Sequence, residues 1–244
     1  MSSPAHDPRD NLSRIKRPSP LGTTVFVGLR MLDPLLQHAI LAHNVGSALI
    51  TRLGGRIIPQ GAPISDVIAL SPYRLVLLSM AAGGAFKQIF WLLTVSQEEM
   101  PVKSAIAISA INIILNSANS LLFLCAATTT VRGRAENLSD PGFPSIPLAR
   151  KRFKKDPRNK GKNYTGGLFS LARHINYGGF TLWRTGYALA SGGWIWGGVV
   201  GALFFYDFAT RGVPVLDDYC QAKYGEAWSA YKNKVSFKLF PGLY

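Results

Sequence analysis

The sequence RHINYGG at residues 173–179 and the sequence DDYCQAKYGEAWSAY at residues 217–231 stand on either side of a long apolar run. Both stretches combine basic, aromatic and polar side chains, whereas residues 180–209 between them are mostly apolar residues and glycine. Polar groups that bracket membrane-length apolar segments are typical of a site at the ends of membrane helices. The C-terminal part of the chain therefore predicts an intramembrane site that opens to the cytosol.

The composition also favours a membrane protein. Charged residues make up 16% of the 244 residues and apolar residues 48%, whereas a soluble domain carries about 25% charged residues. The net charge of +14 requires a negative partner, which is nucleic acid, anionic lipid or a phosphate-bearing cofactor. Because the basic residues lie in linkers between apolar segments, they fit cytosolic loops of a membrane protein and argue against nucleic acid.

Hydropathy predicts an all-α, polytopic helical membrane protein with about five to seven transmembrane helices. Residues 73–95 and 104–128 are clear spans, and residues 180–191 and 193–209 are apolar runs separated by a break at Ser191-Gly192-Gly193. Residues 21–50 are apolar but contain charged residues and proline. This segment is compatible with a broken transmembrane helix, an interfacial amphipathic helix or a helix that lines a polar cavity.

Four regions are predicted along the chain. Residues 1–20 are a disordered cytosolic lead, residues 21–131 carry the N-terminal transmembrane helices, residues 132–165 form a basic cytosolic loop, and residues 166–244 contain the C-terminal motifs. Residues 132–165 are assigned to the cytosol because they carry the excess of Lys and Arg that is typical of cytosolic segments.

A last helix is predicted to begin at Pro214. Asp217 and Asp218 would occupy its first turn and Lys232 and Lys234 its last turn, which complements the helix dipole. Apolar and aromatic residues recur along it at helical spacing, so we expect a cytosolic amphipathic helix that covers the pocket enclosed by the spans.

Three asparagines, Asn112, Asn116 and Asn119, follow one another at helical spacing within the span 104–128. They therefore share one helical face, which either hydrogen-bonds to neighbouring helices or faces a ligand. The two cysteines, Cys125 and Cys220, are far apart in apolar or helical contexts, and we expect two free thiols.

The C-terminal motifs resemble those of known membrane enzymes. The sequence GGLF at residues 166–169 and the later Asn176-Tyr177-x-Gly179 resemble the C-terminal domain of steroid 5α-reductases. The stretch around Arg173-His174 and the ending at residues 220–244 are similar to sterol C14- and C7-reductases and the lamin B receptor. The wider superfamily, labelled DUF1295, also includes isoprenylcysteine carboxyl methyltransferases.

The resemblance implies a reductase that transfers a hydride from NADPH to a C=C bond of a steroid, sterol or other lipid-like enone. It implies a phosphate-binding role for Lys162, Arg173 and Lys223. The remaining cofactor-binding candidates are His174, Asn176, Tyr177, Asp218, Tyr224 and Trp228, and the candidate proton donors are Tyr187, Tyr73 and Glu99, with His38 as a further option.

Two positions depart from the family patterns. Phe180 stands where the reductases usually carry an acidic residue, and Ile175 stands where the methyltransferases usually carry proline. An alternative is therefore an S-adenosylmethionine-dependent carboxyl methyltransferase, in which the same residues bind that cofactor and Arg173 orients an acceptor carboxylate. A third alternative is a member of the fold without catalytic activity.

The expected location is a multi-pass position in the membrane of the endoplasmic reticulum, since sterol-like chemistry and positively charged inner loops fit there. The expected partners are a hydrophobic small-molecule substrate, such as a steroid or lipid, and membrane lipid.

Overall fold

The computed structural model of this chain describes residues 15–60, 62–96, 98–125, 153, 157–159 and 162–244. The disordered lead predicted for residues 1–20 falls largely outside these ranges, as does most of the basic loop predicted for residues 132–165. The described residues form two compact units. One unit, the N-terminal unit, contains residues 15–125 and the segment 186–198; the other, the C-terminal unit, contains residues 153–185 and 199–244.

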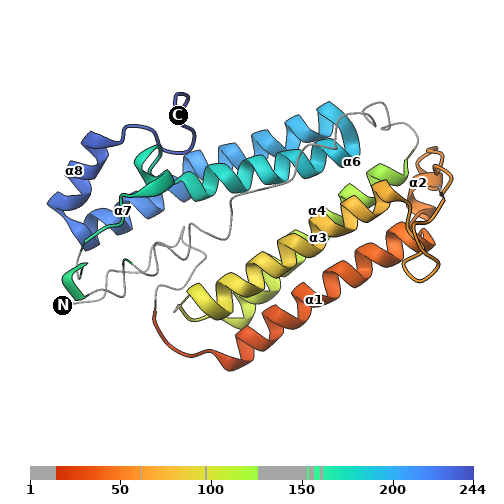
Figure 1. Ribbon diagram of the computed structural model, residues 1–244, viewed down its shortest axis with the longest axis horizontal. Helices are drawn as coiled ribbons and strands as arrows, with labels where there is room; N and C mark the ends of the chain where they lie inside the picture. The colour runs from red at the N-terminus through yellow and green to blue at the C-terminus, as the bar shows by residue number, and fades with distance from the viewer. Residues whose placement is uncertain (1–14, 61, 97, 126–152, 154–156, 160–161) are drawn as a thin grey trace. The chain divides into compact units, whose positions relative to one another are not determined.

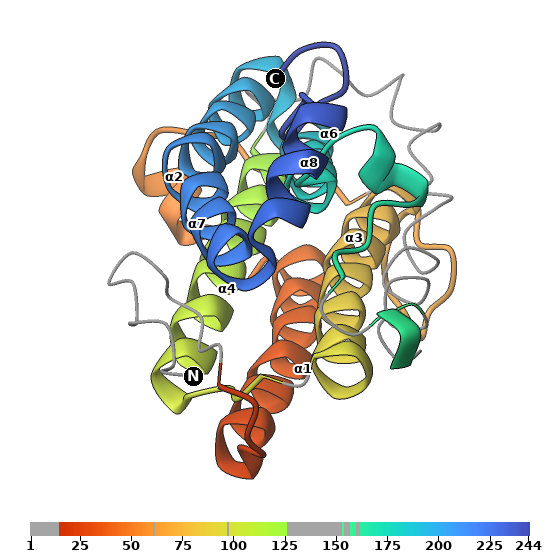
Figure 2. The same cartoon turned by 90° about the vertical axis from the view of Figure 1, so that its left-hand side faces the viewer.

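Three long helices make up most of the N-terminal unit: α1 (Pro20–His43), α3 (Pro72–Phe90) and α4 (Val102–Leu124). They run alongside one another in both views (Figures 1 and 2), with α1 packed against α3 and α4. The predicted spans 73–95 and 104–128 thus correspond to α3 and α4, and the ambiguous segment 21–50 contains one continuous helix with Pro34 inside it.

Contacts along α1 fix the directions of its two neighbours. Asp33 and Gln37 of α1 bond to Asn116 and Ser120 of α4, and both pairs are 83 positions apart, so the two helices are parallel. In contrast, α3 is antiparallel to α1, because Arg74 near its start bonds to the Leu41 carbonyl near the end of α1. Phe26 near the start of α1 packs with Leu92, which follows α3.

Shorter elements connect these helices. A five-residue helix, α2 (Ala48–Arg52), follows α1, and a π-helical turn, Trp91–Val95, extends α3. An isolated β-bridge joins Ile57 to Cys125. Both Cys125 and Cys220 are free thiols, as the sequence predicts.

The two apolar runs after residue 179 belong to one element, α6 (Ile175–Asp207), which reverses direction at Gly193. Gly193 has φ 75° and ψ −170°, a conformation that favours glycine. In the N-terminal unit the Gly197 position faces Leu189, and in the C-terminal unit Gly201 faces Thr185. The two arms therefore pair in antiparallel directions, and α6 is a helical hairpin whose arms lie side by side (Figure 1).

The prediction of one C-terminal helix beginning at Pro214 is wrong. A π-helical turn, Phe208–Gly212, continues α6 directly into α7 (Val213–Tyr224), and a separate helix α8 (Glu226–Lys234) follows. Gly225 between them has φ 52°, which ends α7 and changes the direction of the chain. The expected apolar face is instead shared by both helices, where Cys220, Trp228, Tyr231 and Val235 pack together.

The C-terminal segment packs back onto the start of α6. Tyr231 donates its hydroxyl to the Phe169 carbonyl in the short 3-10 helix Gly167–Ser170, and a second 3-10 helix covers Pro157–Asn159. A Cβ at Gly178 would lie 2.3 Å from the Leu239 carbonyl oxygen. Only glycine therefore allows this approach between α6 and the segment around Leu239.

We expect Gly178→Ala to lower the free energy of unfolding by about 1–3 kcal/mol, because the added methyl must push the Leu239 backbone away. Unfolding of the detergent-solubilised protein measures this change. Gly198→Ala is the control, since a Cβ there meets nothing within 4 Å. Equal stabilities of the two variants would contradict the close packing.

Four helical stretches among the described residues are long and apolar enough to cross a membrane, namely Pro20–His43, Pro72–Val95, Val102–Leu124 and Ile175–Tyr224. The last of them includes both arms of the hairpin. The chain is thus an all-α membrane protein, while the predicted number of about five to seven crossings and the cytosolic side of the C-terminal helices stay predictions.

Candidate functional site

The two sequence stretches quoted above meet in the C-terminal unit through Arg173, His174 and Asp217. His174 Nε2 lies 2.9 Å from Asp217 Oδ1, and Arg173 Nη2 lies 3.9 Å from Asp217 Oδ2. The side chains of Arg173 and His174 are 6% and 1% exposed, whereas that of Asp217 is 22% exposed. The start of α6 and the first turns of α7 are therefore joined by a mostly buried ion-pair cluster, which we call the Asp217 cluster.

Arg173 also holds the C-terminal segment in place. Its Nη1 atom donates to the carbonyl oxygens of Val235 and Ser236 at 2.7 and 3.0 Å. The backbone N–H groups of Arg173 and His174 donate to the carbonyls of Phe237 and Lys238. Much of the hydrogen-bonding capacity of Arg173 is thus used on the chain itself, which leaves less of it for a cofactor phosphate.

Aromatic rings stack beside the Asp217 cluster. The ring centres of Tyr177 and Phe208 are 4.5 Å apart, and the two rings are nearly parallel with an interplanar angle of 3°. The His174 ring stacks on the Tyr177 ring, with 6.1 Å between the ring centres. Phe180 packs edge-on against Phe204 and Phe208. The aromatic rings beside the Asp217 cluster are therefore packed mainly against one another, and Tyr177, Phe180 and Phe208 are half-buried.

Arg184 packs against the rings of this aromatic group. Its guanidinium carbon lies 4.6 Å from the centre of the Trp183 ring and 5.5 Å from that of Phe180. The resemblance to reductases leads one to expect an acidic residue at the position of Phe180, but here that position belongs to an aromatic group stabilised by a buried cation.

Two nitrogen donors, one in the Asp217 cluster and one beside it, are left without a partner among the described residues. Arg173 Nε and Trp228 Nε1 are buried, and neither has a hydrogen-bond partner among the residues that the structure describes. The Trp228 ring lies 6.1 Å from that of His174. A carboxylate or phosphate oxygen would satisfy these donors, since unpaired buried donors are costly.

Three other cofactor candidates, Asp218, Lys223 and Tyr224, lie on α7. Lys223 donates to the Tyr219 hydroxyl at 2.9 Å, and its ammonium lies over the rings of Tyr219 and Tyr224. Asp218 is exposed, next to the half-buried Asp217. Lys162 and Asn176 are also exposed, so both are accessible to a ligand from solvent.

The three candidate proton donors belong to the N-terminal unit. Tyr187 is fully buried and donates to the Leu77 carbonyl at 3.3 Å. Glu99 pairs with Arg17 at 2.8 Å, and Tyr73 is half-buried near the start of α3. Their catalytic roles stay predictions.

Asp217 is the site residue that sequence reasoning missed, because Asp218 was chosen instead. Helical spacing could have identified Asp217. It lies three residues before Cys220 and four before Gln221, and therefore on the side of α7 that packs inward. No group of three or more His, Cys, Asp or Glu residues suited to a metal ion occurs within the described ranges.

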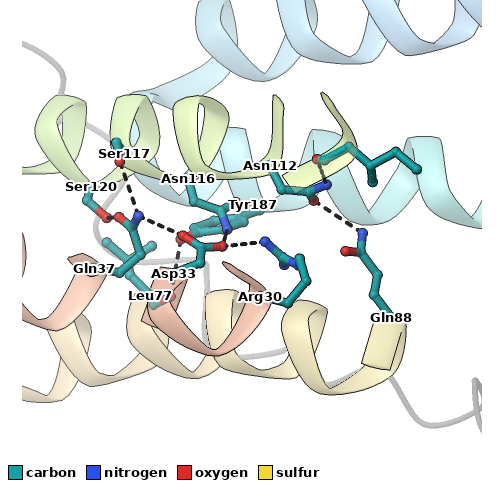
Figure 3. A network of polar contacts seen from close by, with 11 residues as sticks. Arg30, Asp33, Gln37, Leu77, Gln88, Asn112, Asn116, Ser117, Ser120 and Tyr187 are labelled. Carbon is teal, nitrogen blue, oxygen red and sulfur yellow. Dashed lines mark hydrogen bonds and ion pairs between the residues drawn. The ribbon is translucent and has the colours of Figure 1, made fainter. Parts of the chain in front are cut away.

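The asparagine face of α4 bonds to neighbouring helices, as one of the two alternatives predicts. Asn116 donates to Asp33, Asn112 accepts from Gln88, and Asn119 accepts from Trp196. Figure 3 shows the first two of these contacts within a larger polar network.

These features define an integral membrane protein of the DUF1295 superfamily, to which the chain belongs. Residues 147–235 match the family model described as "Protein of unknown function (DUF1295)". The chain is 44% identical to the protein named "Probable O-methyltransferase ustE" from Ustilaginoidea virens, over 93% of this chain and 87% of that protein. It belongs to the same family as that protein.

Two reductases match a smaller part of the chain. The Delta(14)-sterol reductase ERG24B from Gibberella zeae is 30% identical over 38% of this chain and 29% of its own length. The 7-dehydrocholesterol reductase from Danio rerio is 31% identical over 35% of this chain and 18% of its own length. No solved structure matches the chain significantly.

Proposed function

We propose that this chain is a membrane enzyme that transfers a methyl group from S-adenosylmethionine to an oxygen atom of an apolar molecule. The observation that carries the proposal is the similarity to the Ustilaginoidea virens protein, which covers 93% of this chain. A match of that extent includes the N-terminal helices as well as the C-terminal motifs. It therefore bears on the whole enzyme, whereas the reductase matches bear on about a third of it.

The side chains around the Asp217 cluster fit this cofactor. When bound, S-adenosylmethionine supplies a methyl group on a positively charged sulfur. The unused donors Arg173 Nε and Trp228 Nε1 are suited to its carboxylate. Tyr177 and Phe208 stack on each other and are both half-buried, so the ring surface that this pair leaves uncovered is suited to the cationic and adenine parts of the cofactor, because aromatic surfaces attract cations and stack with flat rings. Arg173 therefore has the role of orienting the cofactor, with Asp217 holding Arg173 in position.

A second candidate function is NADPH-dependent reduction of a C=C bond in a steroid, sterol or lipid-like enone. The local similarity to the two sterol reductases favours it. In that reaction Lys162, Arg173 and Lys223 would hold phosphates, and Tyr187, Tyr73 or Glu99 would supply the proton. The aromatic surroundings of Phe180, where reductases carry an acid, make this the weaker candidate.

The two functions are distinguished by thermal unfolding of the detergent-solubilised protein with S-adenosylmethionine, S-adenosylhomocysteine, NADPH and NADH in parallel. A ligand that binds the native state raises its apparent stability, by about 2.7 kcal/mol at a concentration one hundred times its Kd. We expect stabilisation by the two S-adenosyl compounds alone. Stabilisation by NADPH alone would replace the first proposal with the second.

Asn176→Ala is expected to weaken cofactor binding about tenfold without changing the stability of the ligand-free protein. Asn176 is exposed in the first turn of α6, next to Tyr177, so its loss removes a polar contact but no core packing. Asn233→Ala is the matched control, because Asn233 is an exposed asparagine on α8. The same Kd in both variants would remove Asn176 from the site.

Lys223→Met separates the two cofactors. If Lys223 holds a phosphate, the variant lowers the affinity for NADPH about tenfold or more, because a charge-assisted hydrogen bond is lost. In the methyltransferase Lys223 has no such role, and the affinity for S-adenosylmethionine should stay the same.

We also propose the endoplasmic reticulum as the location, which imaging of a fluorescent fusion against an organelle marker tests.

A further inference from the structure

A group of polar side chains, most of them buried and the others half-buried, lies between α1, α3 and α4 of the N-terminal unit (Figure 3). We call it the Arg30 network. Its members are Arg30, Asp33 and Gln37 on α1, Gln88 on α3, and Asn112, Asn116, Ser117 and Ser120 on α4. None of these residues is part of the Asp217 cluster.

One end of the network is fully satisfied. Asp33 is completely buried and accepts hydrogen bonds from Arg30 Nη1 at 2.7 Å, Gln37 Nε2 at 3.0 Å and Asn116 Nδ2 at 2.7 Å. Gln37 in turn accepts from Ser120 at 2.7 Å. This end has the donors and acceptors that a structural network needs.

The other end is not satisfied. Arg30 is also completely buried, and its Nε and Nη2 atoms have no hydrogen-bond partner in the described part of the chain. These two atoms are the adjacent donors along one edge of the guanidinium group, the arrangement that binds two acceptor atoms at once. An intramembrane arginine with one free edge is costly and is typical of a functional site.

An unused acceptor lies at the same level of the helices. Bonded residues of α1 and α4 are 83 positions apart, so the residue of α4 opposite Arg30 is Ile113, which directly follows Asn112. Asn112 accepts from Gln88 Nε2 at 3.2 Å, whereas the buried Gln88 Oε1 has no partner among described residues. In addition, Pro34 has no N–H to donate to the Arg30 carbonyl.

We infer that the unsatisfied end of the Arg30 network, formed by Arg30 and Gln88, binds an uncharged polar group, carrying both an accepting oxygen and a donor hydrogen, on an otherwise apolar molecule. The oxygen accepts from Arg30 Nε and Nη2, and the hydrogen is donated to Gln88 Oε1. A hydroxyl beside a carbonyl group has this chemistry. The group is uncharged because Asp33 already balances Arg30, and a carboxylate would leave a net negative charge inside the helices.

This inference deepens the proposed function, since it names the class of molecule that would receive the methyl group, and it rests on that function only in calling the ligand a substrate. Binding to the Arg30 network is measured without any cofactor. If no ligand binds at the Arg30 network, the proposal of cofactor binding at the Asp217 cluster still stands. If no cofactor binds at the Asp217 cluster, the proposal of ligand binding at the Arg30 network still stands.

Isothermal titration calorimetry of the detergent-solubilised protein tests the inference, with titrations into empty micelles subtracted. The probes are naphthamide, naphthoate and methylnaphthalene, which share a ring system and carry a neutral donor–acceptor group, an anion and no polar group, respectively. We expect naphthamide to bind about tenfold or more tightly than either of the others, the effect of the hydrogen bonds to Arg30.

Arg30→Lys keeps the positive charge beside Asp33 but lacks the two-donor edge, so naphthamide binding should fall about tenfold or more. Gln88→Met is the second variant and should also weaken naphthamide, because it removes the acceptor without touching the Arg30–Asp33 pair. Ser120→Ala, at the satisfied end, should keep the affinity. Tighter binding of naphthoate, no binding of naphthamide, or full naphthamide affinity in either Arg30→Lys or Gln88→Met would overturn the inference.

Discussion

Replacement of Asp33 by leucine is expected to lower the free energy of unfolding by about 3–5 kcal/mol, because it leaves Arg30 as a buried charge without a counter-ion. Asp33 and Arg30 are both completely buried, and Asp33 accepts three hydrogen bonds from side chains of α1 and α4. The substitution thus removes the acceptor shared by all three donors. Unfolding in mixed detergent micelles measures the change.

The double variant Arg30→Met/Asp33→Leu separates the uncompensated charge from the lost packing. It should recover most of the stability, since an apolar pair of similar volume often replaces a buried ion pair without loss. Ser120→Ala, which removes one hydrogen bond to Gln37, should cost only about 1 kcal/mol. A double variant as unstable as Asp33→Leu would show that packing, and not charge, explains the effect.

Asp217→Asn is expected to lower both stability and cofactor affinity. The Asp217 carboxylate lies against His174 at 2.9 Å and Arg173 at 3.9 Å, and losing its charge should cost about 1–3 kcal/mol of stability. Because Arg173 is then less well fixed, we expect the affinity for S-adenosylmethionine to fall about tenfold or more. Thermal unfolding with and without the cofactor measures both effects in one experiment.

The matched control is Asp207→Asn. Asp207 pairs with Arg211 at 2.7 Å, but both side chains are about 40% exposed, and an exposed ion pair contributes about 0–1 kcal/mol. This variant should keep the stability and the cofactor affinity of the original protein. If Asp207→Asn and Asp217→Asn behave alike, the Asp217 cluster has no special role.

The apolar spans were predictable because their signal is local. Residues 73–95 and 104–128 are mostly apolar over a length that can cross a membrane, and the structure places α3 and α4 there. The segment 21–50 stayed ambiguous because its charged residues are explained by partners elsewhere in the chain. Asp33 pairs with Asn116, 83 positions later, and no pattern within α1 reveals that contact.

The C-terminal region shows the same limit. The sequence predicts that RHINYGG and the stretch around Asp217 belong to one site, but periodicity alone predicts one helix for residues 214–235. Gly225 is compatible with a helix interior, and its φ of 52° depends on the packing of Trp228 and Tyr231 against Cys220. Asp217 and not Asp218 contacts His174 because of the side on which α7 packs, and only the fold determines that side.

The reversal at Gly193 also has an evolutionary consequence. Because the arms of α6 pair in opposite directions, residues added to or removed from both arms equally near Gly193 leave the pairing at Tyr177 and Phe208 unchanged. Descendants of this protein in thicker or thinner membranes can therefore lengthen or shorten the hairpin at its tip. Such changes preserve the contact between His174 and Asp217, whereas an insertion in a single arm would shift Asp217 away from His174.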